Sequence, residues 1–166
     1  IARNSDDCHY SINLSGQTLA SPNLIKFVKD RLEQYRVPPE QLTFEITETF
    51  AITHIEAAID FITEVTQLGC QFALDDFGSG LSSFSYLQRL PVQKLKIDGV
   101  FIQNLGQEPR NQSFVKTMIA LAKSKDMETV AEYVETEEDM LLLQEFGIDY
   151  CQGYYIHKPS PWIVSG

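Results

Sequence analysis

The stretch that decides the fold is Phe72-Ala73-Leu74-Asp75-Asp76-Phe77-Gly78-Ser79-Gly80. A short apolar run followed by two acids and two glycines predicts a strand that ends in a tight loop. Because side chains alternate along a strand, Asp75 and Asp76 are expected to point in different directions. Such a pair can hold a different divalent cation each, or share one. For this stretch alone, an Asp-rich turn without any ligand is the plainer interpretation.

The composition is that of one soluble globular domain of 166 residues, 43% hydrophobic and 22% charged. No apolar run approaches the roughly 20 residues of a membrane span. Cys8, Cys70 and Cys151 lack metal-type spacing, which favours a reducing, cytoplasmic setting. A net charge of −10 argues against a DNA or RNA polymer as partner. The sequence does not begin with Met, so we expect it to belong to a longer parent protein. Other segments of that parent could tether it to a membrane.

Strands and helices are expected to alternate along the chain. Helices are predicted to begin at Ser21-Pro22, at a capping box of Thr53 and Glu56, and at Thr136. Glycines at 69 and 147 are expected to end the last two of these helices. In addition to the stretch above, the expected strands cover residues 10–16, 42–47, 92–98, 128–132 and 149–152.

This alternation predicts right-handed βαβ units and a parallel sheet. Two architectures compete, a doubly wound open sheet and a (β/α)₈ barrel, and neither shows its usual fingerprint. Six expected strands fall short of eight, and 166 residues fall short of the roughly 250 of a typical barrel. If the fold is a barrel, part of it is missing.

Polar side chains interrupt the apolar strands toward their carboxyl ends. Parallel α/β folds bind ligands at that edge, so we expect these side chains to meet in one region. Chance could place any one of them there, but it is a poor explanation for all. The residues are Asn13, Glu45, Asp75 with Asp76, Lys96, Glu132 and Gln152.

The residue types in this set indicate which reaction the site could catalyse. Carboxylates with an amide oxygen are hard ligands, suited to Mg²⁺ or Mn²⁺ and poor for zinc. Two such ions would clamp a phosphodiester and lower the pKa of a bound water. Lys96 could orient that water or stabilise charge on the phosphorus group. The residues therefore predict metal-assisted phosphodiester hydrolysis.

Six motifs together resemble those of a known family, the EAL domain, in the family's order. EAL domains are bacterial phosphodiesterases that linearise the second messenger cyclic di-GMP. The resemblance runs from about Ser11 to Pro159. The motifs are Ser11-Ile12-Asn13-Leu14-Ser15, Phe44-Glu45-Ile46-Thr47-Glu48, Asp75-Asp76-Phe77-Gly78-Ser79-Gly80, Lys94-Leu95-Lys96-Ile97-Asp98, Ala131-Glu132-Tyr133-Val134-Glu135-Thr136 and Cys151-Gln152-Gly153-Tyr154.

The resemblance implies that residues 1–166 are the C-terminal two-thirds of one (β/α)₈ barrel with two metal ions, Mg²⁺ or Mn²⁺. Asn13, Glu45 and Asp75 would bind the first ion. Asp75 and Asp76 would hold the second with help from Glu132. Ca²⁺ is expected to bind but to inhibit, because it supports no efficient catalysis.

The resemblance also assigns catalytic and structural roles. Lys96 would contact the catalytic water, and Gln152 would complete the catalytic, substrate-binding pocket together with Glu132. Glu48 resembles the glutamate that anchors the loop after Asp76. In the family that loop takes part in dimer contacts, which implies a homodimer.

Two features depart from the family pattern. The family is named for a Glu-Ala-Leu motif on its first strand, and the Glu of that motif is a metal ligand. No Glu-Ala-Leu triplet occurs in this chain. We interpret this as truncation and expect residues 1–166 alone to be inactive. We also expect the parent protein to carry sensory or GGDEF-type domains. Tyr133 stands where the family most often has Gly.

Two alternatives stay open: a degenerate member that senses cyclic di-GMP without cutting it, and an unrelated α/β protein.

Overall fold

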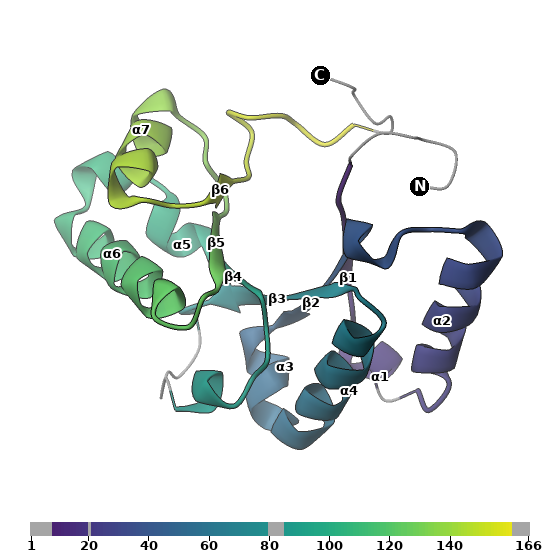
Figure 1. Cartoon of the computed structure of the whole chain (residues 1–166). Helices are drawn as coiled ribbons and strands as arrows, with labels where there is room; N and C mark the ends of the chain where they lie inside the picture. The colour runs from purple at the N-terminus through teal and green to yellow at the C-terminus, as the bar shows by residue number, and fades with distance from the viewer. Residues whose placement is uncertain (1–7, 20, 80–84, 161–166) are drawn as a thin grey trace. The chain divides into compact units, whose positions relative to one another are not determined.

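The computed structural model describes residues 8–19, 21–79 and 85–160. Contacts divide the chain into two compact units, Ile1–Lys94 and Leu95–Gly166, which are taken in turn. Both units alternate strands with helices (Figure 1). Within the described ranges, no helix is both long enough and apolar enough to cross a membrane.

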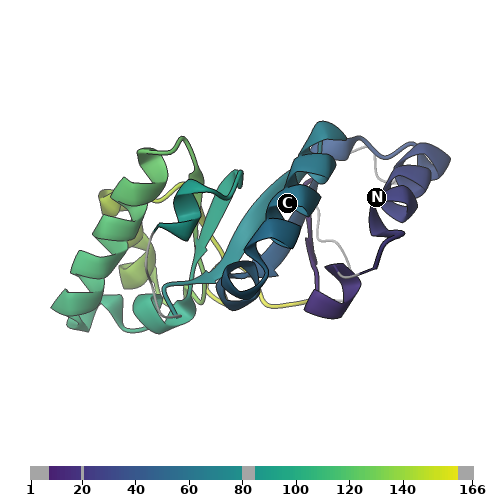
Figure 2. The same cartoon turned by 90° about the horizontal axis from the view of Figure 1, so that it is seen from below.

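The first unit is built on three parallel strands that lie side by side in chain order. The strands are β1 (Tyr10–Asn13), β2 (Leu42–Thr47) and β3 (Gln71–Phe77). Helices α3 and α4 pack against β2 and β3, and Figures 1 and 2 show them on the same face. The helices are α1 (Gly16–Leu19), α2 (Leu24–Tyr35), α3 (Glu48–Thr53) and α4 (Ile55–Gln67), with short 3₁₀ turns at Pro39–Gln41 and Tyr86–Gln88.

The core of this unit lies between α4 and the strands. Phe61 of α4 meets Phe44 of β2 and Phe72 of β3 edge to face, with ring centroids 6.4 Å and 5.9 Å apart. Such pairs add about 0.5–1.5 kcal/mol beyond the area that they bury. The inner face of α4 continues through Ile62 and Val65, which are both fully buried.

Two predicted helix starts in this unit are wrong. Thr53 is the last residue of α3, and its hydroxyl donates to the carbonyls of Thr49 (2.9 Å) and Phe50 (3.1 Å). The hydroxyl is therefore engaged in its own helix, and His54 takes the N-cap position of α4. Helix α2 similarly begins at Leu24, because residues 21–24 form a turn in which the Leu24 amide donates to the Ser21 carbonyl at 3.1 Å.

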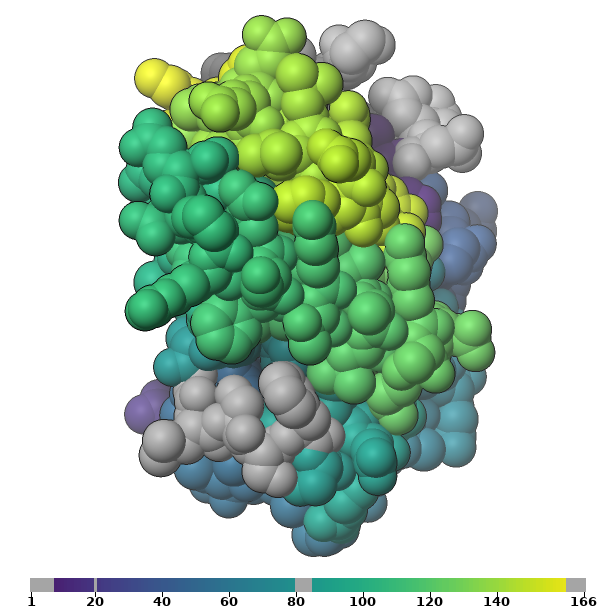
Figure 3. All heavy atoms as spheres, turned by 90° about the vertical axis from the view of Figure 1, so that its left-hand side faces the viewer, coloured from purple at the N-terminus to yellow at the C-terminus, as the bar shows by residue number. Residues whose placement is uncertain are grey.

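The second unit holds three further strands in chain order, and its boundary falls just inside the first of them. Helices α6 and α7 lie side by side on its surface, as Figure 3 shows. The strands are β4 (Lys94–Ile97), β5 (Glu128–Ala131) and β6 (Tyr150–Cys151), and the helices are α5 (Gly99–Ile102), α6 (Pro109–Lys123) and α7 (Glu137–Phe146), with a 3₁₀ turn at Leu105–Gln107.

Helix α7 begins and ends where the sequence predicts. The Thr136 hydroxyl accepts from the Asp139 amide at 3.1 Å, which satisfies one amide of the first turn. Gly147 ends the helix with φ = 81°, a conformation that glycine adopts without steric cost. Gly69 behaves in the same way after α4, with φ = 96°.

The hydrogen bonds that lead into β4 decide between the two architectures. The Gln93 amide donates to the Phe72 carbonyl at 3.0 Å, so the chain enters β4 alongside β3. A doubly wound sheet of the common order would instead return to β1 at this point. The Glu132 amide then donates to the Ile97 carbonyl at 3.2 Å, next to the end of β4. Consecutive parallel strands of this kind belong to a (β/α)₈ barrel, which is present here in part.

Candidate active site at the strand ends

The register of the first unit puts three of the predicted ligands on one face of the sheet. Asn13 pairs with Glu45 across β1 and β2, and Thr47 pairs with Asp75 across β2 and β3. Paired residues share a face, and so do residues two apart. Asn13, Glu45 and Asp75 therefore face the same side, with Asp75 one pleat nearer the carboxyl ends. Glu45 is buried, Asp75 is half-buried and Asn13 is exposed.

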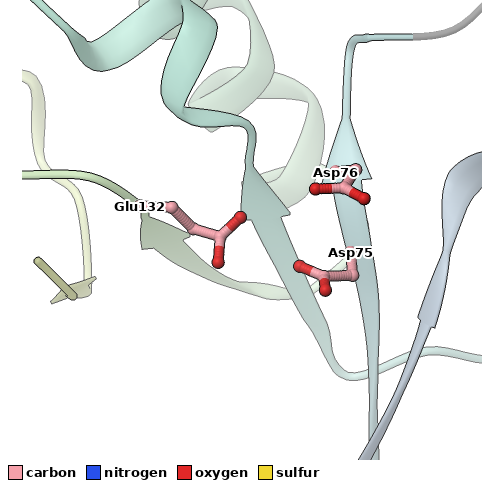
Figure 4. A group of neighbouring side chains, drawn as sticks. All are labelled: Asp75, Asp76 and Glu132. Atoms are coloured by element: carbon pink, nitrogen blue, oxygen red, sulfur yellow. The ribbon is translucent and has the colours of Figure 1, made fainter. Parts of the chain in front are cut away.

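Asp76 does not alternate with Asp75 as expected. One carboxylate oxygen of Asp75 lies within 4.8 Å of one of Asp76, which a regular strand would not allow. The reason is the backbone of Asp76, whose φ of 54° lies in the left-handed region and breaks the pleat. The expectation that the two side chains diverge is wrong. The pair instead offers two carboxylates to one place, as Figure 4 shows at the end of β3.

Glu48 is a fully buried carboxylate at the first residue of α3. Its Oε2 accepts from the Gly78 amide at 2.9 Å, and its Oε1 accepts from the Tyr86 hydroxyl. Burial, and then the bond to Glu48, raise the pKa of Tyr86 well above its usual value. Glu48 thus joins the start of α3 to both flanks of the loop after Asp76. Residues 80–84 of that loop lie outside the described part of the chain.

In the second unit, Lys96 and Glu132 form an ion pair. Lys96 Nζ lies 2.9 Å from Glu132 Oε1, and both side chains are nearly buried, with 7% and 11% exposure. Burying a charge costs free energy unless a charge of opposite sign lies beside it. Lys96 and Glu132 are such partners for each other. Glu132 follows β5 directly and is drawn in Figure 4.

Gln152 follows β6 and is tied to β5 through the backbone. Its amide donates to the Ala131 carbonyl at 2.8 Å, and its carbonyl accepts from the Val134 amide at 3.1 Å. Gln152 and Glu132 line the same pocket, which has a volume of about 270 Å³. The other lining residues are Tyr133, Glu135, Gly153, Tyr154 and Pro159.

Three residues of these surroundings were not predicted as site residues. Tyr86 supplies a hydrogen bond to Glu48, while Glu135 and Tyr154 line the pocket of Gln152. Glu135 and Tyr154 stand inside recognised motifs, so their position was a usable signal. Tyr86 comes from a 3₁₀ turn with no pattern of its own, and only the fold reveals its contact.

The chain matches the family model of the EAL domain over residues 1–159. It is 40% identical over 156 residues to the cyclic di-GMP phosphodiesterase PdeB of Shewanella oneidensis, which covers 94% of this chain. The chain spans only 18% of the length of that relative.

Solved structures of EAL domain proteins are also similar to this chain. The complex of the PaMucR phosphodiesterase with c-di-GMP superposes with a TM-score of 0.87 at 33% identity, covering 92% of this chain and 62% of that one. The FimX EAL domain of Pseudomonas aeruginosa bound to c-di-GMP has a TM-score of 0.87 at 34% identity, with 92% and 62% covered. On the family match and these similarities, the chain belongs to the EAL domain family.

Proposed function

We propose that the protein containing this chain hydrolyses cyclic di-GMP to linear pGpG by attack of water on one phosphodiester. The observation that carries the proposal is the set of strand-end residues inside an EAL family member. The chain contains the acidic residues that the family resemblance assigns to these strands, namely Glu45, Asp75, Asp76 and Glu132. Relatives named as cyclic di-GMP phosphodiesterases match over nearly its whole length.

The donor set fits hard divalent cations. The Asp75 and Asp76 carboxylates come close to each other, and Glu45 is a buried carboxylate on the same face as Asp75. Carboxylate and amide oxygens suit Mg²⁺ or Mn²⁺. We assign Asn13, Glu45 and Asp75 to one ion, and Asp75 and Asp76, with Glu132, to a second. Bound there, the ions would lower the pKa of a water and offset charge on the phosphodiester.

The remaining residues would position the reactants. Lys96 Nζ, held beside Glu132, would donate a hydrogen bond to the attacking water and fix its direction. The Gln152 amide, which can both donate and accept, would hold the nucleotide in the adjoining pocket. Glu48 would keep the loop after Asp76 in place through the Gly78 amide and the Tyr86 hydroxyl.

The cellular setting is part of the same proposal. We infer a cytoplasmic enzyme, since cyclic di-GMP is a second messenger, and a homodimer that uses the loop after Asp76. The much greater length of PdeB supports further regulatory domains, sensory or of GGDEF type, in the parent protein.

The test is turnover of cyclic di-GMP by the full-length parent protein, with linear pGpG measured by chromatography. Mg²⁺ or Mn²⁺ should support turnover, while excess chelator or Ca²⁺ should abolish it. Asp75→Asn should remove metal-dependent turnover, whereas Asp60→Asn, an exposed carboxylate on α4, should leave it unchanged. Strong hydrolysis in chelator would refute the metal assignment. Tight binding without any turnover in Mg²⁺ or Mn²⁺ would instead identify a sensor.

A further inference from the structure

The segments that follow β4 and β5 meet in three successive contacts within the second unit. Lys96 Nζ lies 2.9 Å from Glu132 Oε1, and the Glu132 amide donates to the Ile97 carbonyl at 3.2 Å. The next residue, Tyr133, lays its ring against the backbone of Gly99. The ion pair of the proposed site therefore lies at one end of this short interface, and the Tyr133 ring lies at the other.

Gly99 is the seat of the Tyr133 ring. A Cβ added to Gly99 would lie 2.3 Å from Tyr133 Cδ2, 2.6 Å from Cγ and 2.8 Å from Cβ, so no larger residue fits while the ring stays in place. The seat is itself fixed, because Gly99 is buried at the first residue of α5 and the Asp98 carboxylate accepts from the Val100 amide at 2.9 Å. The ring therefore rests on backbone that has little freedom to move.

The backbone of Tyr133 is strained. Its φ is 55°, a region that a bulky residue rarely adopts and that glycine adopts freely. Such strain persists only where the surrounding structure enforces it, and the contact with Gly99 is a constraint of that kind. Because one peptide bond joins Tyr133 to Glu132, a ring fixed on Gly99 also restricts the backbone that carries the Glu132 carboxylate.

The exposure of Tyr133 separates this role from core packing. Tyr133 is 57% exposed, whereas the side chains of Lys96 and Glu132 are nearly buried. Removing an exposed ring leaves no cavity in the core, so its loss should cost the fold little free energy. A ring that adds little to stability, yet is kept in a costly conformation, points to a local role in positioning its neighbour.

We propose that Tyr133 is a positioning residue for the reaction: its ring, seated on Gly99, keeps the Glu132 carboxylate at its distance from Lys96. The inference rests on the proposed function, in which Lys96 directs the attacking water and Glu132 helps to hold the second ion. A displacement of about 1 Å in such a group can lower turnover by roughly a hundredfold. Glycine, which the family most often has in place of Tyr133, would relieve the strain but would provide no ring.

The first experiment measures turnover and binding of cyclic di-GMP by variants of the full-length protein. Tyr133→Gly should lower kcat about five- to thirtyfold, because the pair loses its clamp. The Kd, measured by calorimetry in Ca²⁺, should stay within about threefold of the wild type, since positioning acts mainly in the transition state. Tyr133→Phe keeps the ring and should keep wild-type kcat. Unchanged kcat in Tyr133→Gly would overturn the proposal, and a higher Kd with wild-type kcat would make the ring a ligand contact instead.

Two further variants test the seat and the specificity of the effect. The φ of Gly99 is not in the left-handed region, so the methyl of Gly99→Ala meets only the Tyr133 side chain. Gly99→Ala should lower kcat as Tyr133→Gly does, and in the Tyr133→Gly background it should change nothing. Multiplying effects of the two substitutions would contradict the seat assigned to the ring. Tyr155→Ala, at an exposed tyrosine that does not line the pocket of Gln152, should keep wild-type kcat.

The hold on the ion pair can be measured without metal or substrate. Urea unfolding of Lys96→Met, Glu132→Gln and the double variant gives the coupling between the two side chains. In the Tyr133→Gly background this coupling, as a factor in the unfolding equilibrium constant, should be at least about threefold weaker than in the wild type. Equal coupling in both backgrounds would overturn the positioning role.

The unfolding cycle also separates the positioning role from the proposed function, because it requires no turnover. A wild type that binds cyclic di-GMP without cutting it would refute the proposed reaction, while the cycle still decides whether Tyr133 holds the pair. Turnover by the wild type together with equal couplings would leave the proposed reaction in place and refute the role of Tyr133.

Discussion

Two residues beside the strand ends occupy left-handed backbone although neither is glycine: Asp76 after Asp75, and Tyr133 after Glu132. In both cases a predicted metal ligand or catalytic acid is followed by a residue that ends the extended backbone. Strain of this kind persists only where surrounding structure enforces it, and it gathers at functional sites. At Asp76 it brings two carboxylates together, and at Tyr133 it lays a ring on Gly99.

The Lys96–Glu132 ion pair leads to a prediction about catalysis. Lys96→Ala should lower kcat in the full-length enzyme by more than it weakens cyclic di-GMP binding, since the proposed hydrogen bond to water matters most in the transition state. The change also leaves the buried Glu132 without this cation, so the protein should lose about 3–5 kcal/mol of stability. Turnover, calorimetric Kd and urea unfolding measure the three effects.

A matched comparison keeps the two roles apart. Lys94→Ala removes a lysine from the same strand that is only half-buried, and its cost in stability should be smaller. If Lys96→Ala keeps wild-type kcat while losing stability, Lys96 has a structural role only, and the assignment to the water is wrong.

The Tyr86–Glu48 hydrogen bond gives a pH dependence. The pKa of Tyr86 is raised above its ordinary value of 10.0 in the folded protein. Above pH 10 the unfolded chain therefore loses this proton while the folded protein keeps it, and stability falls as the pH rises. Tyr86→Phe should reduce that alkaline loss and should cost about 1–2 kcal/mol at pH 7, where the hydrogen bond is intact.

Urea unfolding at pH 7 and at pH 10.5 tests this. Tyr35→Phe, at an exposed tyrosine on α2, should follow the wild type at both values. An alkaline loss of the same size in Tyr86→Phe and wild type would show that other groups cause it.

At the scale of elements, the sequence predicted best where one strong pattern acts alone. The range of β2 and the ends of α7 were correct, because an alternation of apolar and polar residues with several β-branched side chains, a Thr cap and a Gly stop each leave little choice. The start of α4 was missed, because the Thr53 hydroxyl has two sets of backbone partners in reach, and only packing selects the carbonyls of α3. The turn at Asp76 was missed for a related reason, since nothing in Asp-Asp specifies a positive φ.

The cap of α7 can be tested directly. Thr136→Ala removes the acceptor of the Asp139 amide and should destabilise the protein by about 1 kcal/mol. Thr63→Ala, at an exposed position inside α4, should be neutral or slightly stabilising, because alanine is the better helix former. Thermal unfolding of both variants gives the comparison, and equal losses would mean that the cap contributes nothing specific.

At the scale of the whole molecule, each unit supplies a different part of the proposed chemistry. The first holds the hard ligands Asn13, Glu45, Asp75 and Asp76, and the second holds the Lys96–Glu132 pair and Gln152. The sequence predicted that these side chains lie toward the carboxyl ends of their strands, where parallel α/β folds bind ligands. It could not predict Tyr133 against Gly99, because that contact joins the start of α5 to the segment after β5, which share no sequence pattern.

Residues 1–166 alone should be inactive on cyclic di-GMP. Among the described strands β1 pairs only with β2 and β6 only with β5, so each leaves an edge that can pair with another chain. Beside β1 the first unit also has an apolar pocket of about 420 Å³, lined by Ile12, Phe27 and Phe44 among others. An apolar surface of this kind favours association over a stable monomer. The chain further lacks the Glu-Ala-Leu motif, whose Glu the family resemblance makes a metal ligand.

Sedimentation and a turnover assay on residues 1–166, beside the full-length parent, measure both consequences. We expect association or partial unfolding of the shorter chain and turnover below one hundredth of the parent's, since losing one interaction with a catalytic ion costs about 3 kcal/mol or more of transition-state stabilisation. Restoring the preceding residues of the parent should restore both a defined oligomer and activity, while the same extension carrying Ala in place of the motif's Glu should restore the oligomer alone. A well-folded, active monomer of residues 1–166 would show that the ligands present here suffice for the reaction.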